Sequence, residues 1–305
     1  MEWSRAKNIL ILTFLALNLF LGYSIWEEFY MHFPSRVVSQ REVEQARDNL
    51  DSVNLELKAS FSRQTFSMSF LTVSNRIQDQ ETLTAGLLDP ELSIQLETEE
   101  EGRVSVYQQS SKKLSLWENG RISFLQEFPQ EPQEPEAPGE IENFEESQLD
   151  ESAAVSLAEE ALRDVQLFPP DARLEEVYCL EEDRYLATYH QVYKNHSLYG
   201  GYLNVWITPR GIQQLEMYWL DPQGFSGQEI STISAAAALS RLADTLSPSS
   251  ERQAVESVNL GYYSQAFDAQ KWDMVPVWRI RLSNGRVYYI NAYTGEQEGM
   301  EDKLF

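Results

Sequence analysis

One apolar stretch near the amino terminus limits what this chain can fold into. It runs from residue 9 to residue 25 without a charged side chain. As a helix, this stretch would be roughly 26 Å long, which is close to the hydrocarbon thickness of a bilayer. Glu27 and Glu28 follow it directly. The sequence therefore predicts a transmembrane helix over residues 9–26.

The charges on either side of this helix predict its orientation. Arg5 and Lys7 precede it, and basic flanks tend to stay in the cytoplasm. We therefore expect a cytoplasmic tail over residues 1–8 and an extracytoplasmic body after Trp26, in a single-pass protein of the cell membrane. A cleaved signal peptide is the rival interpretation, but residues 22–26 form a poor cleavage site.

Composition bounds the function of the body. A formal charge of −24 argues against nucleic acid as a partner, because its phosphates would be repelled. The chain is 42% hydrophobic and 12% aromatic, which is enough for two small domains with cores of their own. Its single cysteine, Cys179, excludes an internal disulfide framework.

The segment over residues 27–127 is predicted to be a small, strand-rich extracytoplasmic domain. Ser39 followed by Glu42 has the spacing of a capping box, which predicts a short helix from that point. Alternating apolar residues over 61–70 and 103–107 predict strands. Residues 114–124 contain an Asn-Gly pair between two such runs, which is typical of a β-hairpin.

Residues 128–150 differ from their surroundings. They alternate prolines with glutamates and carry few large apolar side chains. Such a segment buries too little surface to offset the entropy lost on ordering. The sequence predicts a semi-extended acidic linker or a long loop here.

The remainder, residues 151–305, contains a weak repeat with a period of about eighty residues. Each half, about 151–225 and 231–300, begins with a helical stripe and continues into aromatic-rich strands joined by tight turns. A helix covering an antiparallel sheet, twice over, is an α+β arrangement. The predicted chain is thus a transmembrane helix followed by antiparallel sheets with covering helices in a two-domain body.

Three short motifs give a specific resemblance. They are WSRAK at residues 3–7, PVWRI at 276–280, and YYINA at 288–292 ahead of Thr294 and Gly295. With the helix-then-hairpin layout, these motifs resemble extracytoplasmic PepSY modules and, more narrowly, the YycI family of low-GC Gram-positive bacteria. The resemblance implies a membrane-anchored regulator of the Yyc (Wal) two-component system. It also implies two partners, a sister protein resembling YycH and a membrane sensor histidine kinase that controls cell-wall metabolism.

The sequence contains only weak matches to catalytic and metal-binding patterns. His190 and His196 lack a carboxylate or cysteine at metal-ligand spacing, and His32 lies beside the predicted anchor. Cys179 oriented by His190 would be a nucleophile, but a lone buried cysteine in a strand explains it without chemistry. Ser110 begins a loose S-x-x-K match without the helix start that acyl-transfer enzymes use. We expect no enzyme activity, metal or cofactor.

Asn18 is the most unusual residue of the apolar run. A carboxamide in hydrocarbon seeks a hydrogen-bonding partner, although one Asn is also tolerated without a partner. Gly22 lies on the same helical face, where it would let another helix approach closely. Asn18, Gly22 and Trp26 are therefore our candidate intramembrane contacts with a partner.

Two functions are consistent with this pattern. The first is a non-enzymatic regulatory protein that adjusts the histidine kinase through its helix and outer domain, together with the YycH-like partner. The second is an extracytoplasmic inhibitor or chaperone of a protease or cell-wall enzyme, for which the helix is only a tether.

Overall fold

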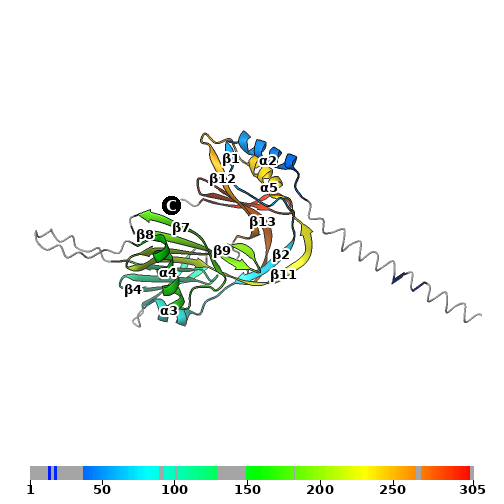
Figure 1. Cartoon of the computed structure of the whole chain (residues 1–305). Helices are drawn as coiled ribbons and strands as arrows, with labels where there is room; N and C mark the ends of the chain where they lie inside the picture. The colour runs from blue at the N-terminus through cyan, green and yellow to red at the C-terminus, as the bar shows by residue number, and fades with distance from the viewer. Residues whose placement is uncertain are drawn as a thin grey trace, which may run out of the picture.

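The structure is a computed structural model of the whole chain (Figure 1). It describes residues 13–14, 17–18, 37–88, 93–99, 102–128, 149–181, 183–265 and 269–302. The body is a sheet-rich α+β fold in which four helices accompany a 15-stranded sheet. The sheet-rich α+β class predicted from the sequence is thereby confirmed.

Short helices separate groups of strands in the described body, and most of these strands pair antiparallel. In chain order they are α2 (Gln40–Ser52), β1 (Leu55–Leu57), β2 (Ser67–Asn75), α3 (Gln80–Leu87), β3 (Ser93–Glu99), β4 (Gly102–Gln109), β5 (Lys112–Trp117), β6 (Ile122–Gln126), α4 (Glu151–Asp164), β7 (Ala172–Glu181), β8 (Arg184–Tyr193), β9 (His196–Thr208), β10 (Gly211–Tyr218), β11 (Leu220–Ser231), α5 (Ala235–Thr245), β12 (Gln253–Tyr263), β13 (Trp272–Leu282), β14 (Arg286–Asn291) and β15 (Gln297–Asp302).

The capping box at the start of α2 is confirmed. The Ser39 backbone N–H donates to Glu42 Oε2 at 2.8 Å, and the Glu42 N–H donates to Ser39 Oγ at 3.3 Å. Together these bonds satisfy two backbone donors that the first turn of a helix leaves unpaired. Val43, Ala46 and Leu50 then form the buried face of α2.

The predicted tight turns are also present. Gly120 between β5 and β6, Gly211 between β9 and β10, and Gly285 between β13 and β14 have φ values of +84°, +117° and +83°. Glycine reaches this left-handed region without the steric cost that a Cβ atom imposes. Helices α4 and α5 begin the two halves of residues 151–305, as their helical stripes predicted.

One local prediction was wrong, and one helix was not predicted. Residues 61–66 do not form a strand, and only a single bridge joins Gln64 to Val37. The reason is local, because the Ser62 hydroxyl accepts from the Gln64 N–H at 3.1 Å and so competes with strand pairing. Helix α3 was not expected, although Asp79 caps it by accepting from the Thr82 N–H.

Strand pairing joins parts of the chain that are far apart in sequence. The longest path through the sheet has the order β11-β2-β13-β12-β9-β10-β6-β5-β4-β3. Strand β2 thus lies between β11 and β13, and β6 pairs with β10. The ladder therefore connects segments on both sides of residues 128–150, most of which lie outside the described residues. The predicted division into two domains, and into two repeats, stays a prediction.

The two largest hydrophobic cores lie over different parts of this sheet (Figure 1). In the first, which we call the α5 core, helix α5 packs on β13 and β14, and α2 packs on α5 and β1. In the second, the α4 core, helix α4 packs with α3 against β5, β6, β8, β9 and β10. Each core therefore contains residues from an early and a late part of the chain.

The predicted transmembrane segment lies almost wholly outside the described residues. Thr13, Phe14, Leu17 and Asn18 are helical and exposed. Among the described residues, no helix has the length and apolar character needed to cross a membrane. The predicted helix over residues 9–26 and its orientation remain predictions.

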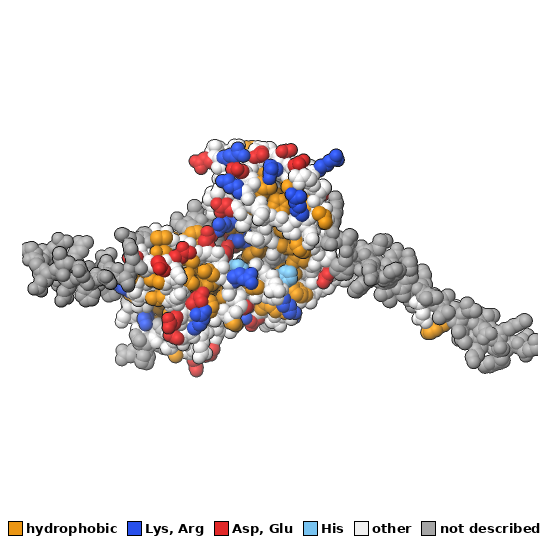
Figure 2. Space-filling view, viewed as in Figure 1, with side chains coloured by type: hydrophobic (Ala, Val, Ile, Leu, Met, Phe, Trp, Pro, Cys, Tyr) orange, Lys and Arg blue, Asp and Glu red, His pale blue; other side chains and the backbone are white. Residues whose placement is uncertain are grey.

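The surface of the body mixes charges of both signs. On the face seen in Figure 2, acidic and basic side chains are interleaved, with apolar groups between them. Such interleaving is typical of a solvated surface.

Candidate functional site

The site predicted from the sequence is only partly within the described residues. Asn18 is helical and exposed, whereas Gly22 and Trp26 lie outside the described part of the chain. The structure therefore does not test whether these three side chains form one contact surface.

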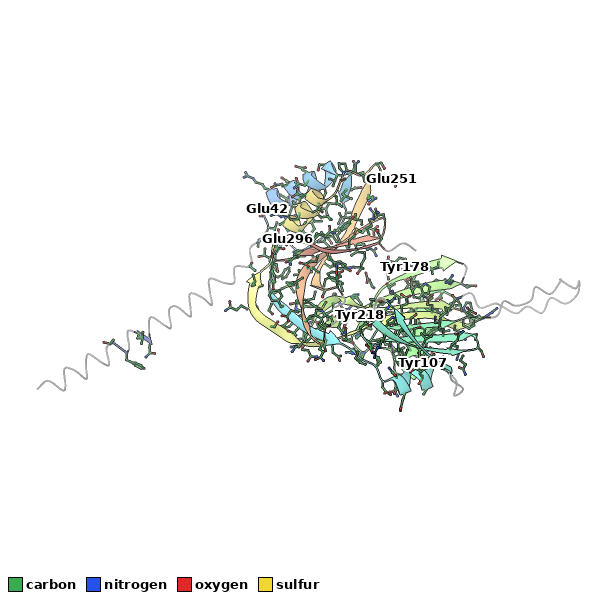
Figure 3. The ribbon with its side chains drawn as sticks, turned by 180° about the vertical axis from the view of Figure 1, so that it is seen from behind. Glu42, Tyr107, Tyr178, Tyr218, Glu251 and Glu296 are labelled. Carbon is green, nitrogen blue, oxygen red and sulfur yellow. The ribbon has the colours of Figure 1, made fainter. Side chains whose placement is uncertain are left out.

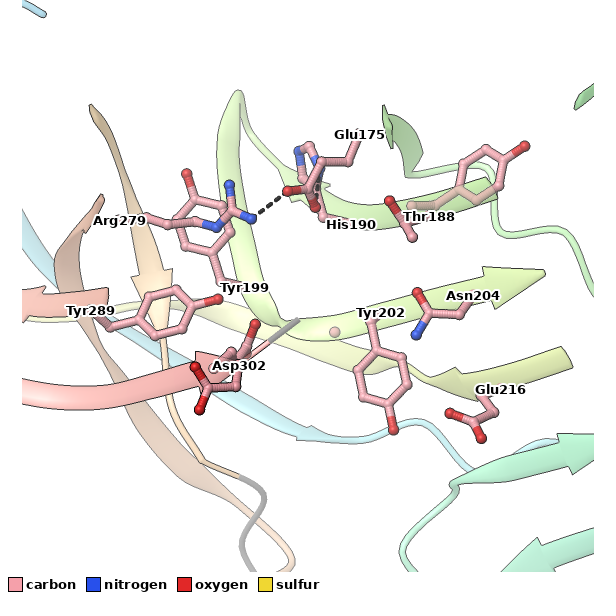
Figure 4. A pocket seen from close by; sticks show the side chains of 13 residues that line it. Glu175, Thr188, His190, Tyr199, Tyr202, Asn204, Glu216, Arg279, Tyr289 and Asp302 are labelled. Atoms are coloured by element: carbon pink, nitrogen blue, oxygen red, sulfur yellow. Dashed lines mark hydrogen bonds and ion pairs between the residues drawn. The ribbon is translucent and has the colours of Figure 1, made fainter. Parts of the chain in front are cut away.

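A different site emerges from the folded body. A cleft of about 270 Å³ opens where β7, β8 and β9 meet β13, β14 and β15, between the two cores (Figure 4). Its walls are built from polar and aromatic side chains of seven strands. The lining residues are Glu175, Thr188, Tyr189, His190, Tyr199, Gly201, Tyr202, Asn204, Glu216, Arg279, Tyr289, Glu301 and Asp302.

Arg279 on β13 is the most buried charge of the cleft. It is 5% exposed, and its guanidinium forms an ion pair with Glu175 on β7. The guanidinium carbon also lies 5.1 Å from the ring centre of Tyr199. Burial by itself would lower the pKa of Arg279, but the Glu175 carboxylate outweighs it and holds the pKa above its ordinary value. Arg279 is therefore charged and paired.

A β-bulge places Glu175 for this contact. Leu174 pairs with Tyr189 and Glu176 pairs with Thr188, so Glu175 has no partner of its own in the β7–β8 ladder. An extra residue of this kind interrupts the normal alternation of side chains along a strand. Glu175 and Glu176 can therefore both reach β13, where they meet Arg279 and Arg281.

We call these two ion pairs the β7–β13 clasp, because they join strands of the two cores. The Glu175–Arg279 pair is buried, with side chains 16% and 7% exposed. The Glu176–Arg281 pair is more open, at 28% and 24%. Tyr178 donates its hydroxyl hydrogen to Glu176, and Arg281 also contacts Glu256 at 3.1 Å. The clasp thus consists of a buried ion pair at the cleft and a more solvent-exposed ion pair outside it.

His190 forms the upper wall of the cleft beside Glu175 (Figure 4). Its Nε2 lies 3.2 Å from Ser197 Oγ, and its Nδ1 lies 3.9 Å from Glu175 Oε2. The imidazole is therefore positioned by a hydroxyl on one side and a carboxylate on the other.

A polar row crosses the floor of the cleft. Thr188 lies opposite Asn204, and Asn204 lies opposite Glu216, on the neighbouring strands β8, β9 and β10. Residues directly opposite in an antiparallel ladder share one face of the sheet. The other face of these strands is apolar and packs against α4. The row therefore presents a hydroxyl, a carboxamide and a carboxylate to the cleft.

Tyrosines close the remaining wall. The rings of Tyr289 and Tyr263 are stacked, with centres 3.9 Å apart and planes inclined by 7°. The ring of Tyr199 lies 5.8 Å from that of Tyr289. Burial raises the pKa of both Tyr199 and Tyr289, so both hydroxyls are neutral at physiological pH.

The catalytic alternatives weighed from the sequence do not come together. Cys179 pairs with Tyr185, whereas His190 pairs with Arg173. Five residues of strand β8 separate these positions, which is about 17 Å. Cys179 is exposed, so its interpretation as a buried core residue was wrong. The described residues contain no group of three or more His, Cys, Asp or Glu side chains suited to a metal ion.

By its fold, this protein is a sheet-rich α+β protein, and it has a polar cleft between two hydrophobic cores. The chain belongs to the YycI protein family, whose model matches residues 35–293. This is a family of regulators of the YycFG (WalRK) two-component system. The resemblance seen in the sequence motifs is thereby confirmed.

Solved structures give a second comparison. An uncharacterized protein from Eubacterium rectale is 10% identical, with a TM-score of 0.55, and the match covers 87% of this chain and all of that chain. At this identity the likeness shows the fold alone. The Bacillus megaterium YpeB C-terminal domain is 12% identical with a TM-score of 0.36, covering 75% of this chain and all of that domain. The comparison with curated proteins found no match.

Proposed function

We propose that this protein is a membrane-anchored, non-enzymatic regulator that adjusts a sensor histidine kinase controlling cell-wall metabolism, together with a YycH-like partner. The observation that carries the proposal is the family match over residues 35–293. Regulation of this kind requires the protein to bind two kinase states with different free energies. Both the helix and the outer domain supply surfaces for such a difference.

The structure of the α5 core supports a mechanical link between helix and body. Helix α2 begins at Gln40, only 14 residues after Trp26, where the predicted transmembrane segment ends. It packs on α5, and the two together cover the sheet. Helix α2 is therefore the first described helix through which a change at the anchor would reach the body.

The intramembrane surface of Asn18, Gly22 and Trp26 provides the main test. Interhelical hydrogen bonds in membranes contribute about 0.6–2 kcal/mol, so Asn18→Leu should weaken association with the partners by about 3- to 30-fold. Gly22→Leu should weaken it by steric bulk. Thr13→Leu is the matched control, because it adds the same side chain to the same segment. The readouts are co-purification of the partner and kinase, and kinase output at equal expression.

An unchanged result for both Asn18→Leu and Gly22→Leu would reduce the helix to a tether. The alternative function, an extracytoplasmic inhibitor or chaperone of a protease or cell-wall enzyme, would then be preferred. Replacing residues 9–26 with an unrelated anchor distinguishes the two proposals. The tether survives this exchange, whereas intramembrane regulation does not.

Orientation is tested with a membrane-impermeant thiol reagent on whole cells. Cys179 is exposed and is the only cysteine of the chain, so it reports on the body without any substitution. For the ends of the helix, Ser4→Cys and Ser35→Cys are made in a Cys179→Ser background. Labelling of Cys179 and of the Ser35 variant is expected. Labelling of the Ser4 variant alone would reverse the orientation.

A further inference from the structure

The surface beside the point where the chain enters the body exposes apolar side chains. Val37, the first described residue of the body, is 66% exposed and is joined to Gln64 by a single bridge. Phe66, two residues after Gln64, is 37% exposed. Phe61 and Phe66 border a hollow of about 370 Å³, in which the ring of Trp278 lies 6.4 Å from that of Phe66. We call Val37, Phe61 and Phe66 the entry surface.

Basic side chains accompany the entry surface, although the chain as a whole is strongly acidic. Residues 57–78 contain Lys58, Arg63 and Arg76 but no aspartate or glutamate. Arg76 is paired with Asp221 at 2.7 Å. Arg63 is exposed, forms no ion pair within the described part of the chain, and accepts the Val38 N–H on its backbone oxygen at 2.7 Å. Lys58 is 63% exposed and has a loose contact with Glu56 at 3.9 Å.

This combination fits the chemistry of a phospholipid surface. Aromatic side chains are favoured at the interface between lipid headgroups and acyl chains. Lysine and arginine side chains are attracted to anionic headgroups. Exposed rings with weakly matched positive charges beside them therefore favour a membrane over an acidic protein surface, which would use the charges alone.

The length of chain ahead of the entry surface keeps it close to a membrane. The predicted transmembrane segment ends at Trp26, and ten residues, 27–36, separate it from Val37. A fully extended chain of this length spans at most about 36 Å. Tethering raises the effective concentration of the bilayer at this surface, so a weak affinity is enough for contact. The α4 core, to which Tyr107 belongs, is remote from Glu42 at this end of α2 (Figure 3).

We propose that the entry surface docks on the outer leaflet of the membrane that holds the anchor. Phe61 and Phe66 lie at the lipid interface, and Lys58 and Arg63 face lipid phosphates. Docking of this kind fixes the orientation of the α5 core relative to the bilayer. The inference rests on the membrane anchor of the proposed function.

Site-directed fluorescence on the full-length protein in lipid nanodiscs tests the docking. Gln64→Cys, in a Cys179→Ser background, carries the label, because Gln64 is exposed beside Val37. The nanodiscs contain phosphatidylcholine and phosphatidylglycerol, with a nitroxide quencher on the headgroup of a minor lipid. Strong quenching of this label is expected. A label carried by Ser156→Cys, on the exposed side of α4, is the control and should be quenched little.

Arg63→Gln is the decisive variant. The side chain is exposed and has no ion pair among the described residues, so folding should be retained. The attraction of one basic residue to an anionic surface is large enough that its loss should lower the docking equilibrium about fivefold. Arg103→Gln is the matched control, because it removes the same charge from an exposed position on β4 of the α4 core. Nanodiscs without phosphatidylglycerol should reproduce the effect of Arg63→Gln.

Three results would overturn the inference and leave the proposed function intact. One is the absence of quenching at Gln64 in nanodiscs that retain the protein. Another is an equal response to Arg63→Gln and Arg103→Gln, which would mean that net charge alone or the tether alone determines the quenching. The third is a signal that requires two copies in one nanodisc, which would assign the surface to a second copy of the chain. Loss of the protein from the nanodiscs would overturn the anchor, and with it both the inference and the proposed function.

Discussion

The α5 core and the α4 core follow one plan, a helix on an antiparallel sheet, but they bury their helices to different extents. Six residues of α5 are buried, compared with three of α4. Helix α5 lies between the sheet and α2, so two of its faces are covered. Helix α4 is covered mainly on its sheet side (Figure 1). The comparison shows that a helix packed on an antiparallel sheet can be an interior element, as α5 is, or a surface element, as α4 is.

Side-chain size explains the difference. The buried residues of α5 include Ala235, Ala236, Ala238 and Ala243, which allow a second helix to approach closely. The amino-terminal segment of the body supplies that second helix. The α5 core is thus the one into which the predicted anchor leads, and the α4 core is more remote from it.

The largest expected effect tests whether the two cores unfold as one unit. Trp278 of the α5 core and Trp219 of the α4 core are both buried, and each donates its indole N–H at 3.0 Å, to Ile233 O and Asp171 Oδ1 respectively. Trp278→Ala and Trp219→Ala should each lower the free energy of unfolding by about 3–5 kcal/mol. Urea denaturation followed by circular dichroism measures both.

We expect a single transition that shifts with either tryptophan substitution, because β9, β12 and the clasp connect the cores. Trp206→Ala is the control, since Trp206 is only partly buried and should cost less. Two separate transitions, each responding to only one substitution, would show that the cores are independent.

The clasp gives the next largest effect. Glu175→Ala leaves Arg279 buried without a counter-charge, which should destabilise the protein by about 3 kcal/mol. Glu176→Ala removes the more exposed pair and should cost about 1 kcal/mol or less. The double variant Glu175→Leu, Arg279→Met should recover most of the loss in thermal denaturation. Equal losses of stability in Glu175→Ala and Glu176→Ala would contradict the distinction between a buried and an exposed ion pair.

The parallel contact between β9 and β12 is the narrowest connection of the cores. Gly261 pairs with Ser197 there, and a Cβ atom added to it would lie 2.5 Å from Ser197 O. Gly261→Ala should therefore cost about 1–3 kcal/mol through backbone displacement. Gly224→Ala is a useful comparison, because nothing lies within 4 Å of its added Cβ, although its φ of +134° adds local strain. An unchanged melting temperature for Gly261→Ala would rule out tight packing at this junction.

The smallest expected effect is a fall in the free energy of unfolding at alkaline pH, caused by the ionisation of Tyr218. Burial and, secondarily, Tyr202 raise the pKa of Tyr218 to about 12, and its hydroxyl donates to Asn75 Oδ1 at 2.6 Å. An unfolded tyrosine ionises near pH 10, so the neutral folded form keeps its full stability below pH 10 and loses it as pH rises toward 12. The loss at pH 11 should be about 1 kcal/mol or less.

Tyr218→Phe removes this titration. Its free energy of unfolding should start lower, because the hydrogen bond is lost, but should fall less between pH 9 and pH 11. Parallel curves for the variant and the parent protein would mean that Tyr218 does not contribute. Urea unfolding at fixed pH values makes the comparison.

Much of the fold was predictable because its signals are local. Ser39 and Glu42 are three residues apart, and Gly120 and Gly285 each define a turn within four residues. The register by which β2 joins β11 and β13 was not predictable, because no local pattern records which strands pair across 200 residues. The strand predicted over residues 61–66 was wrong because the hydroxyl of Ser62 accepts a backbone hydrogen bond there.

The cleft was invisible in the sequence for a geometric reason. Glu175, Asn204, Glu216 and Arg279 lie on four strands, and only the sheet brings them together. The bulge that aims Glu175 leaves no sequence signal beyond two adjacent glutamates. Only the alternation of apolar and polar residues around Asn204 hinted that one face of β9 is uncovered. The contacts of Asn18, by contrast, rest on sequence reasoning alone.

The pairing of β2 has a consequence for how the protein reaches its folded state. Leu71 on β2 pairs with Met274 on β13, so about 200 residues must emerge between one partner and the other. At synthesis rates of 5–20 residues per second, this gap corresponds to about 10–40 s. The other partner of β2, strand β11, emerges about 150 residues after β2, so for most of that time β2 has neither of its native neighbours. If the predicted helix over residues 9–26 anchors the chain, β2 would be exposed without its partner strands close to the membrane. Its assembly should depend on holding factors there, far more than that of a protein whose neighbouring strands follow one another in sequence.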